Sequence, residues 1–422
     1  MSRKITLDSG LRIITVPQKQ GTQAVTILIL VATGSKYEKE EENGISHFIE
    51  HMLFKGTKKH PSSFEISEIL DEVGGAYNAF TSEDYTGYWA KVRKENFDLA
   101  LDWLTDIFFR AKLESKEIEK EKGVVIEEIN MIHDDPMSYI GCLWQELLYP
   151  HQPAGRQITG SKKTVAELNR EKIINYLKAQ YVGKNTIVCL SGNLEEKEAM
   201  RKVKKSFSRI GKKESWKKVK VIEAQREPAY FLETRKTEQT HFCLGARGYN
   251  SFHPWKYNQA LLAVVLGGMT SSRLFEKVRE KMGAAYYIYT AVSADPDTGF
   301  LVTQAGVDNA KLKKVIAVVL GEYGKVTKKK ISAKELKRAK EYLKGRMTLS
   351  LESSDERAIF YGLQELLEKK ILTLEQIFAK IDKVTAEDIL KTAQSIFIPE
   401  KLNLALIGPF EEKSGIGKLL KI

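Results

Sequence analysis

Residues 168–193 read LNREKIINYLKAQYVGKNTIVCLSGN, and residues 384–409 read VTAEDILKTAQSIFIPEKLNLALIGP. At an offset of 216 residues the two stretches place similar residues opposite each other: Glu171 and Glu387, Ile173 and Ile389, Tyr181 and Phe397, Leu190 and Leu406, Gly192 and Gly408. Each stretch is typical of an amphipathic helix, a turn, a hydrophobic strand and a closing glycine. The same structural unit is therefore expected twice in this chain.

The order of the earlier elements repeats as well. A strand over 24–32 precedes a helix over 45–54, and a strand over 241–246 precedes a helix over 257–266. We predict two homologous α+β domains, each a mixed sheet packed by helices, over residues 1–216 and 217–422. The Lys-rich stretch GKKESWKKVK at 211–220 is the expected linker, and a length of 422 residues suits two domains.

The remaining elements follow from apolar periodicity and from Gly and Pro punctuation. We expect strands over 12–16, 76–81, 86–92 and 186–191, and helices over 64–73, 94–110, 115–132, 137–148, 165–181 and 195–210.

Composition excludes several classes of protein. Hydrophobic residues make up 42% of the chain and charged residues 29%, which excludes a disordered or fibrous chain. Three cysteines, Cys142, Cys189 and Cys243, are too few and too far apart for a disulfide framework or a CxxC metal site. No apolar run reaches the length of a membrane helix, and the first residues lack the apolar core of a signal peptide. We therefore expect a cytoplasmic protein without a membrane partner.

The net charge of +12 lies entirely in the second half of the chain. Residues 1–210 carry 30 basic and 30 acidic side chains, whereas residues 311–346 alone carry 13 basic and 3 acidic ones. Such an excess can favour nucleic acid, but no nucleic-acid-binding module accompanies it. We predict two solvated helices and the turn between them, with selection of acidic peptides as a hypothesis, and no nucleic-acid partner.

The residues with the clearest chemistry form the motif H-x-x-E-H at His47, Glu50 and His51. On a helix these three side chains fall on one side, and the apolar residues around them fall on the other. Two imidazoles at i and i+4 can bind one metal ion, and imidazole suits zinc. A carboxylate one turn from the metal is placed to accept a proton from water.

A catalytic zinc site needs a third protein ligand. The acidic helix over 115–132 offers Glu127 and Glu128, and spacing alone does not choose between them. Glu121 and Glu128 are seven residues apart and share a helix face. Taken alone, such a face is usually a solvated one.

The stretches HFIEHMLFKGT, NAFTSEDYTGYWAKV and IEKEKGVVIEEI resemble the pitrilysin/insulinase family of inverted zincin metallopeptidases, which includes mitochondrial processing peptidase. H-x-x-E-H is the signature of this class. The resemblance implies one Zn²⁺ per chain on His47, His51 and Glu128. It also implies that Glu50 is the general base and that Glu121 supports a ligand or the water.

The resemblance further implies residues that bind substrate. Asn78, Ala79 and Phe80 match the family's edge strand beside the zinc, to which an extended peptide adds through main-chain bonds. Arg279 and Tyr286 match a pair that reaches the substrate from the second domain, where Arg binds a carbonyl and Tyr donates to the oxyanion.

The expected function is that of a zinc-dependent endopeptidase that hydrolyses peptides in an enclosed chamber. The resemblance to the short bacterial type implies that one chain forms half of a clamshell chamber, and that two chains pair as a homodimer. A heterodimer with an inactive relative is the alternative assembly. The alternative function is a non-catalytic or partner subunit of the same fold.

Overall fold

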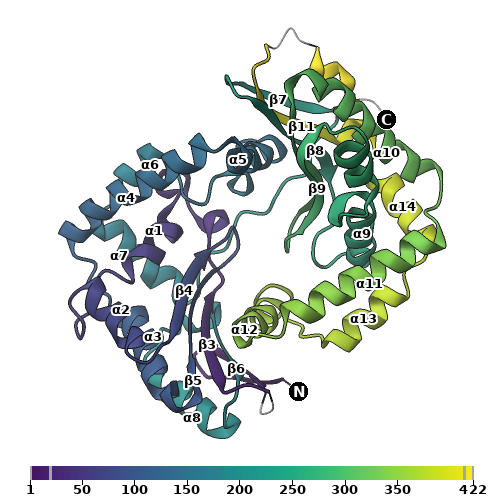
Figure 1. Cartoon of the computed structure of the whole chain (residues 1–422). Helices are drawn as coiled ribbons and strands as arrows, with labels where there is room; N and C mark the ends of the chain where they lie inside the picture. The colour runs from purple at the N-terminus through teal and green to yellow at the C-terminus, as the bar shows by residue number, and fades with distance from the viewer. Residues whose placement is uncertain (1, 19–20, 412–414, 421–422) are drawn as a thin grey trace. The chain divides into compact units, whose positions relative to one another are not determined.

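The computed structural model of the chain describes residues 2–18, 21–411 and 415–420. The chain divides into two compact units (Figure 1). Unit 1 consists of three segments: Met1–Met131, Arg156–Val219 and Ser350–Ile371. Unit 2 consists of the other three: Ile132–Gly155, Lys220–Leu349 and Leu372–Ile422.

Unit 1 contains a six-stranded mixed sheet in the order β1-β2-β6-β3-β5-β4. Its strands are β1 (Arg3–Thr6), β2 (Arg12–Pro17), β3 (Ala24–Val31), β4 (Ala76–Thr81), β5 (Thr86–Arg93) and β6 (Thr186–Gly192). Strand β6 pairs in parallel with β2 and antiparallel with β3. Strand β4 pairs with β5 and lies at an edge of the sheet.

Six helices bury their apolar stripes against one face of this sheet. They are α1 (Ile45–Met52), α2 (Ser63–Asp71), α3 (Phe97–Arg110), α4 (Ser115–Asp134), α7 (Arg170–Gln180) and α8 (Glu196–Ser206). Strand residues that alternate along β3, such as Ile27 and Ile29, point into this core. The short helix α6 (Lys162–Ala166) precedes α7.

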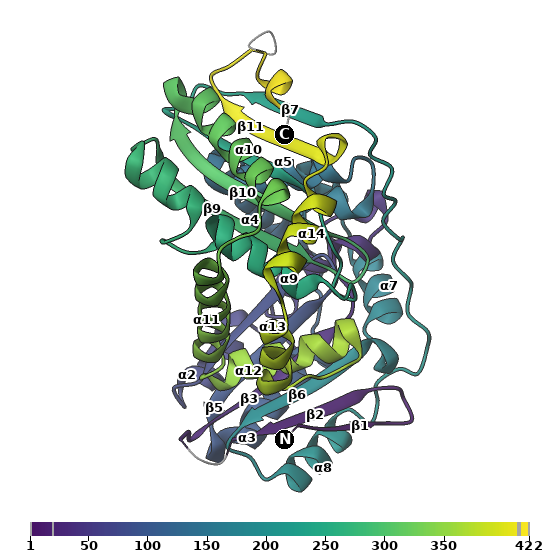
Figure 2. The ribbon, with the colours of Figure 1, turned by 90° about the vertical axis from the view of Figure 1, so that its right-hand side faces the viewer.

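The opposite face of the unit 1 sheet is covered by a segment from late in the chain. Helix α12 (Ser354–Leu363) and the π-helix η9 (Gln364–Glu368) bring Ala358, Tyr361 and Leu366 onto residues such as Leu28 and Leu30 of β3. Figure 2 shows α12 beside β3 and β6.

Polar contacts fix this late segment on the sheet. The Glu365 carboxylate, which is buried, lies 3.0 Å from Lys4 Nζ and 3.5 Å from Arg12 Nη1. The hydroxyl groups of Thr26 and Ser354 are hydrogen-bonded at 2.8 Å. A buried charge is tolerated because it is paired and hydrogen-bonded.

Unit 2 contains a five-stranded mixed sheet in the order β7-β11-β8-β10-β9. Its strands are β7 (Ala229–Thr234), β8 (Gln239–Arg247), β9 (Ala285–Ala294), β10 (Gly299–Asp308) and β11 (Leu402–Gly408). Strand β11 pairs in parallel with β7 and antiparallel with β8. The pairing of β11 therefore matches that of β6 in unit 1.

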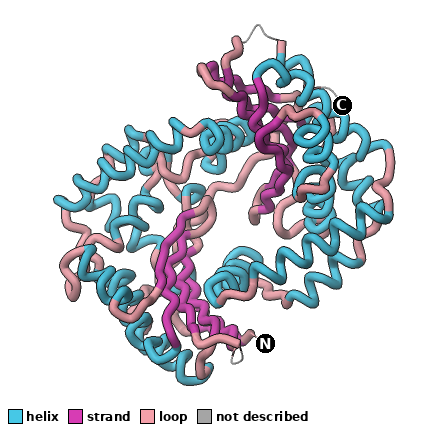
Figure 3. The backbone as a smooth tube through the Cα atoms, in the orientation of Figure 1, coloured by secondary structure: helices cyan, strands magenta, loops and turns pink. Residues whose placement is uncertain are grey.

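Helices pack on both faces of the unit 2 sheet (Figure 3). Helix α5 (Pro136–Leu148) covers one face through Ile140, Leu143 and Trp144. On the other face, Tyr323 of α10 (Leu312–Lys328) donates a hydrogen bond to the carbonyl of Leu244 in β8. The remaining helices are α9 (Lys256–Ala263), α11 (Ala333–Ser350), α13 (Leu374–Asp382) and α14 (Ala386–Ile396).

Short helical turns complete the described chain. The 3-10 turns are η1 (Ser35–Tyr37), η2 (Glu40–Glu42), η3 (Lys94–Asn96), η4 (Pro153–Gly155), η5 (Gly183–Asn185), η8 (Asn309–Lys311), η10 (Pro399–Lys401) and η12 (Ile416–Leu419). Two π-helices, η6 (Val264–Gly268) and η7 (Phe275–Lys281), lie in unit 2.

The repeat seen in the sequence has the same local structure in both copies. Helices α7 and α14 begin and end at positions 216 residues apart, and so do strands β6 and β11. The side chains of Asn169 and Thr385 cap the two helices, because each accepts a hydrogen bond from the backbone N–H group three residues later. The predicted fold of two mixed sheets packed by helices is confirmed.

Two predicted helices were wrong in detail. The expected helix over 165–181 is interrupted, because Leu168 and Asn169 leave the helical conformation and Asn169 starts α7 as its cap. The expected helix over 257–266 changes at Val264 from an α-helix to the π-helix η6. Such π-helical turns are local bulges that apolar periodicity does not reveal.

The expected linker has no helix or strand from 211 to 228, and the chain passes from unit 1 to unit 2 between Val219 and Lys220. Residues 132–155 belong to unit 2 and residues 350–371 belong to unit 1, and the predicted division into 1–216 and 217–422 leaves out this exchange of segments.

The basic segment 311–346 forms α10 and most of α11, and several of its lysines have acidic partners, such as Lys330 with Glu387. Over the described residues, no helix combines the length and apolarity that crossing a membrane requires.

The packing of α12 gives a test of the exchanged segment. A Cβ atom on Gly362 would lie 2.7 Å from Leu30 Cδ1 and 3.5 Å from Cys189 Cβ. Gly362→Val should therefore lower the free energy of unfolding by about 1–3 kcal/mol through overpacking. Gly345→Val is the matched control, because a Cβ on Gly345 in α11 has no atom within 4 Å. Equal thermal unfolding midpoints for the two variants would contradict this packing.

Candidate metal centre

Helix α1 carries the H-x-x-E-H motif and divides into two sides. Its apolar side chains Ile45, Phe48, Ile49 and Met52 are buried in the core of unit 1. The rings of His47 and His51 lie on the other side, with centroids 4.6 Å apart. The helical register therefore brings both imidazoles to one place, as the motif predicts.

The start of α1 is fixed by a residue that sequence reasoning missed. The Glu38 carboxylate accepts hydrogen bonds from the backbone N–H groups of Gly44 and Ser46, each at 2.8 Å. Gly44 has a φ of 96°, and a Cβ there would lie 2.6 Å from the carbonyl oxygen of Thr159. Glu38 thus satisfies otherwise free donors at the helix N-terminus, and no motif in the sequence marks this role.

Helix α4 brings its acidic face to α1. Glu128 Oε1 lies 3.6 Å from His47 Nε2, and Glu128 Oε2 lies 3.7 Å from His51 Nε2. Glu127 is exposed and belongs to no such group. Of the two glutamates that spacing left open, Glu128 is therefore the one that lies beside both imidazoles, and it is also the residue that the family resemblance implies as a ligand.

These three residues fit a zinc ion by their chemistry and spacing. One ligand atom from each of His47, His51 and Glu128 lies within 4.8 Å of the others. Two ligands at about 2.0–2.1 Å from one tetrahedral zinc are about 3.4 Å apart, close to the two distances above. Two imidazoles and one carboxylate leave a fourth position open, which is the donor set of catalytic zinc sites.

Glu121 supports His51 from the second turn of α4. Its Oε1 lies 2.8 Å from His51 Nδ1, and its Oε2 lies 2.7 Å from Lys55 Nζ. Glu121 is only 2% exposed, and each of its two carboxylate oxygens has a partner. Lys55 was missed in the sequence, although its position one helical turn after His51 could have indicated it.

The two histidines differ in how easily they take a proton. Burial, and then the nearby His51, lowers the pKa of His47 to about 4. Burial also acts to lower the pKa of His51, but the hydrogen bond and charge of Glu121, with the charges of Glu128 and Glu50, outweigh it and raise that pKa. His47 is therefore neutral near pH 7, as a metal ligand must be.

Glu50 lies beside this group with one hydrogen bond. Its Oε2 accepts from Thr81 Oγ1 at 2.5 Å. Burial raises the pKa of Glu50, whereas the Thr81 hydrogen bond and the charge of His51 lower it in part. A partly buried carboxylate with a raised pKa next to a candidate metal centre is suited to accept and return a proton.

The predicted edge strand is present as β4. Asn78, Ala79 and Phe80 lie on it, and β4 is the last strand of the unit 1 sheet. The Ala79 N–H donates to Asn78 Oδ1 at 2.8 Å, rather than to a neighbouring strand. This N–H group could therefore donate a hydrogen bond to a carbonyl of a strand added at the outer side of β4.

Arg279 and Tyr286 lie together in unit 2. Arg279 belongs to η7 and Tyr286 to β9, which is an edge strand of that sheet. The guanidinium of Arg279 lies 5.3 Å from the ring centroid of Phe275 and 6.0 Å from that of Tyr286, and it donates to the Tyr286 backbone carbonyl. The Tyr286 side chain itself is 74% exposed.

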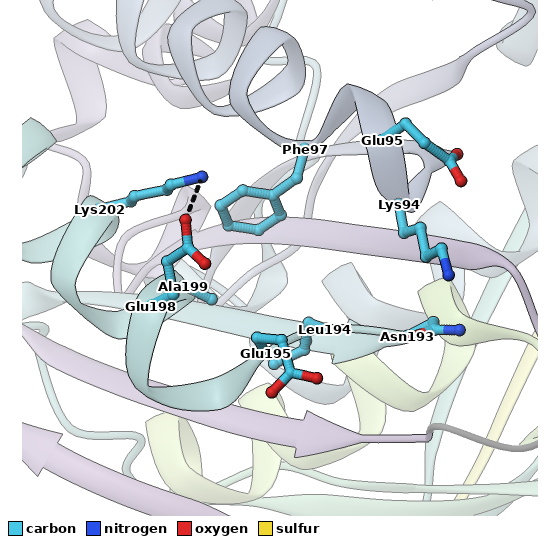
Figure 4. A pocket seen from close by; sticks show the side chains of 9 residues that line it. All are labelled: Lys94, Glu95, Phe97, Asn193, Leu194, Glu195, Glu198, Ala199 and Lys202. Carbon is cyan, nitrogen blue, oxygen red and sulfur yellow. Dashed lines mark ion pairs between the residues drawn. The ribbon is translucent and has the colours of Figure 1, made fainter.

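A cavity of about 350 Å³ in unit 1 is lined by none of these residues (Figure 4). Its walls come from η3, the start of α3, the turn before α8 and the first two turns of α8, and they combine the apolar side chains of Phe97 and Leu194 with charged ones. The ammonium of Lys202 in this lining is paired with Glu198. The cavity is therefore separate from the metal centre in its residues.

Family models match both halves of the chain. The model of insulinase, peptidase family M16, matches residues 13–162, and the model of the peptidase M16 inactive domain matches residues 167–343. The chain therefore belongs to the M16, or insulinase, family of peptidases.

Relatives of known sequence and structure agree with this assignment. The chain is 37% identical over 413 residues to a Bacillus subtilis protein named uncharacterized zinc protease YmxG, covering 97% of this chain and 98% of that protein. It is 31% identical to an uncharacterized zinc protease of Streptomyces coelicolor, covering 97% and 90% of the two chains. The crystal structure of a protease from Helicobacter pylori has the same fold, with a TM-score of 0.90 at 22% identity over 97% of this chain and 99% of that chain.

The raised pKa of His51 predicts how zinc binding depends on pH. Zinc needs the free lone pair on Nε2, so a proton on His51 competes with the metal. Because the pKa lies above its usual value of 6.5, the affinity for zinc should begin to fall while the pH is still above 6.5. Zinc titrations of the metal-free protein between about pH 5 and 8 measure this onset.

The variant Glu121→Gln serves as the comparison. Without the carboxylate charge the pKa of His51 should fall, so the affinity for zinc should begin to decrease only at a lower pH than in the wild type. The affinity at high pH should fall about 10–100-fold, because His51 loses the partner that orients it. An unchanged onset in this variant would contradict the role given to Glu121.

Proposed function

We propose that this chain is a zinc-dependent endopeptidase with one zinc ion per chain, held by His47, His51 and Glu128. The observation that carries the proposal is the convergence of these three side chains, from two helices, within 4.8 Å of one another and beside Glu50. The names of the relatives as zinc proteases support it.

When bound, zinc would acidify a water molecule and polarise the carbonyl of the scissile peptide bond. The protein supplies the remaining chemistry. Glu121 accepts a hydrogen bond from His51 Nδ1–H and so leaves Nε2 free to bind the metal. Lys55 keeps the buried Glu121 carboxylate paired.

Glu50 would move the proton during peptide hydrolysis. Its Oε2 is held by Thr81, so Oε1 is the oxygen available to a water molecule. Glu50 would take a proton from the water molecule while the water oxygen attacks the carbonyl carbon. It then delivers that proton to the nitrogen of the leaving amine, as the C–N bond breaks.

Substrate would bind by main-chain hydrogen bonds to the edge strand β4 at Asn78, Ala79 and Phe80. Arg279 and Tyr286 stay predicted substrate contacts: the first would bind a peptide carbonyl and the second would donate to the oxyanion. The enclosed chamber, the homodimer and the cytoplasmic location also remain predictions.

The alternative is a non-catalytic partner subunit of the same fold. A partner subunit has no need of a metal centre, a base and a supporting carboxylate in one place. The presence of His47, Glu50, His51, Glu121 and Glu128 in this chain therefore favours the peptidase.

Cleavage of quenched fluorescent peptides tests this proposal. The wild-type protein should cleave them, lose activity with a chelator and regain it with zinc. Glu50→Gln should lower kcat by about 10²–10⁴-fold, because the base is lost, yet should still bind one zinc ion. Metal content by mass spectrometry and kcat are the two measurements.

The matched controls lie on α4. Glu128→Gln should weaken zinc binding and activity together, whereas Glu127→Gln, at the exposed neighbouring position, should leave both unchanged. A wild-type protein that binds one zinc ion and cleaves none of the peptides would overturn the proposal in favour of the partner subunit.

A further inference from the structure

The contact between Thr81 and Glu50 joins two different elements. Thr81 is the last residue of β4, and Glu50 lies on α1. Thr81 Oγ1 donates to Glu50 Oε2 at 2.5 Å. Within the described chain, no second hydrogen bond to the Glu50 carboxylate is found, so its orientation rests on this threonine.

A glutamate side chain has several rotatable bonds, and fixing it costs conformational entropy. A donor that holds one oxygen removes most of that freedom and leaves the other oxygen for a proton. Threonine is suited to this role because its branched Cβ restricts rotation about χ1. The Thr81 hydroxyl can therefore stay in one position and restrict the movement of the Glu50 carboxylate.

The backbone that carries Thr81 is itself held on several sides. Thr81 is paired with Thr86 across the β4–β5 hairpin, and the Thr86 hydroxyl donates to the Thr33 carbonyl at 2.9 Å. Asp84, in the turn of this hairpin, is buried and lies 2.9 Å from the buried Lys36 ammonium. Thr81 thus lies where β4 enters a well-supported turn, as a group that sets geometry should.

We propose that Thr81 is a positioning residue for the reaction, which holds Glu50 in the orientation that accepts the proton. The proposal rests on the proposed peptidase function and extends it. Strand β4 is also the edge to which the peptide is proposed to add. One strand would therefore align both the scissile bond, through Ala79 and its neighbours, and the base, through Thr81.

A purely structural role for Thr81 makes a different prediction. If the hydroxyl only stabilised the hairpin, its loss would act like the loss of any other hairpin hydroxyl. Thr86→Val provides that comparison, because it removes the hydroxyl opposite Thr81 and its bond to Thr33 without touching Glu50. It should lower the thermal unfolding midpoint and leave kcat nearly unchanged.

Thr81→Val tests the proposal directly, because valine keeps the branched shape and loses the hydroxyl. We expect kcat to fall by about 10–100-fold, the size of effect that misplacing a reacting group produces. KM and the dissociation constant for zinc should change little, because valine keeps the strand and leaves the three ligands intact. Thr81→Ser, which keeps the donor, should restore most of kcat.

A measurement on the metal-free protein provides a readout that does not depend on activity. Crystal structures should show the Glu50 carboxylate in one position in the wild type and in Thr81→Ser, and in more than one position in Thr81→Val. A single unchanged Glu50 position in Thr81→Val, or an unchanged kcat, would overturn the proposal. So would an equal loss of kcat in Thr86→Val, which would show that the role is structural.

Failure of this inference is distinct from failure of the proposed function. If the wild type cleaves no peptide, the peptidase proposal fails, and with it the inference that extends it. If the wild type cleaves peptides and Thr81→Val cleaves them at the same rate, only the role of Thr81 is wrong.

Discussion

The candidate metal centre depends on the docking of α4 onto α1 through one buried carboxylate. Glu121 is nearly inaccessible to solvent, yet it binds His51 through one oxygen and Lys55 through the other. A buried carboxylate without partners would cost several kcal/mol, by the general penalty of about that size for burying an ion. The pairing at Glu121 therefore fixes the rotation of α4, and that rotation brings Glu128, seven residues later, to the two imidazoles.

The same sheet supports every part of this centre. Its inner face packs against α1 and α4, and its edge strand β4 presents both Thr81 and the outward backbone of Ala79. On the other face, α12 and η9 are held by the ion pairs of the buried Glu365 and by the close approach of Gly362 to Leu30. A late segment of the chain thus completes the unit that contains the candidate metal centre, so the N-terminal half alone leaves this face of the sheet exposed.

Membership of the M16 family agrees with the geometry, and each supplies something different. The family shows the class of protein and the fold. The contacts in this chain give reasons for particular side chains: Glu38 at the start of α1, Lys55 beside Glu121, and Thr81 beside Glu50. None of these three residues belongs to the H-x-x-E-H motif, and their roles are seen in their contacts: Glu38 with the N-terminus of α1, Lys55 with Glu121, and Thr81 with Glu50.

The sequence by itself determined the features that depend on local spacing. The repeat at an offset of 216 residues predicted two similar helix–strand units, and the i, i+3, i+4 spacing placed His47, Glu50 and His51 on one helix side. Spacing could not choose between Glu127 and Glu128, because consecutive residues on a helix point about 100° apart and the partner helix decides which is used. The exchange of residues 132–155 and 350–371 between the units was also invisible. An apolar helix face in the sequence indicates that this face is buried, but only the tertiary structure decides which sheet covers it.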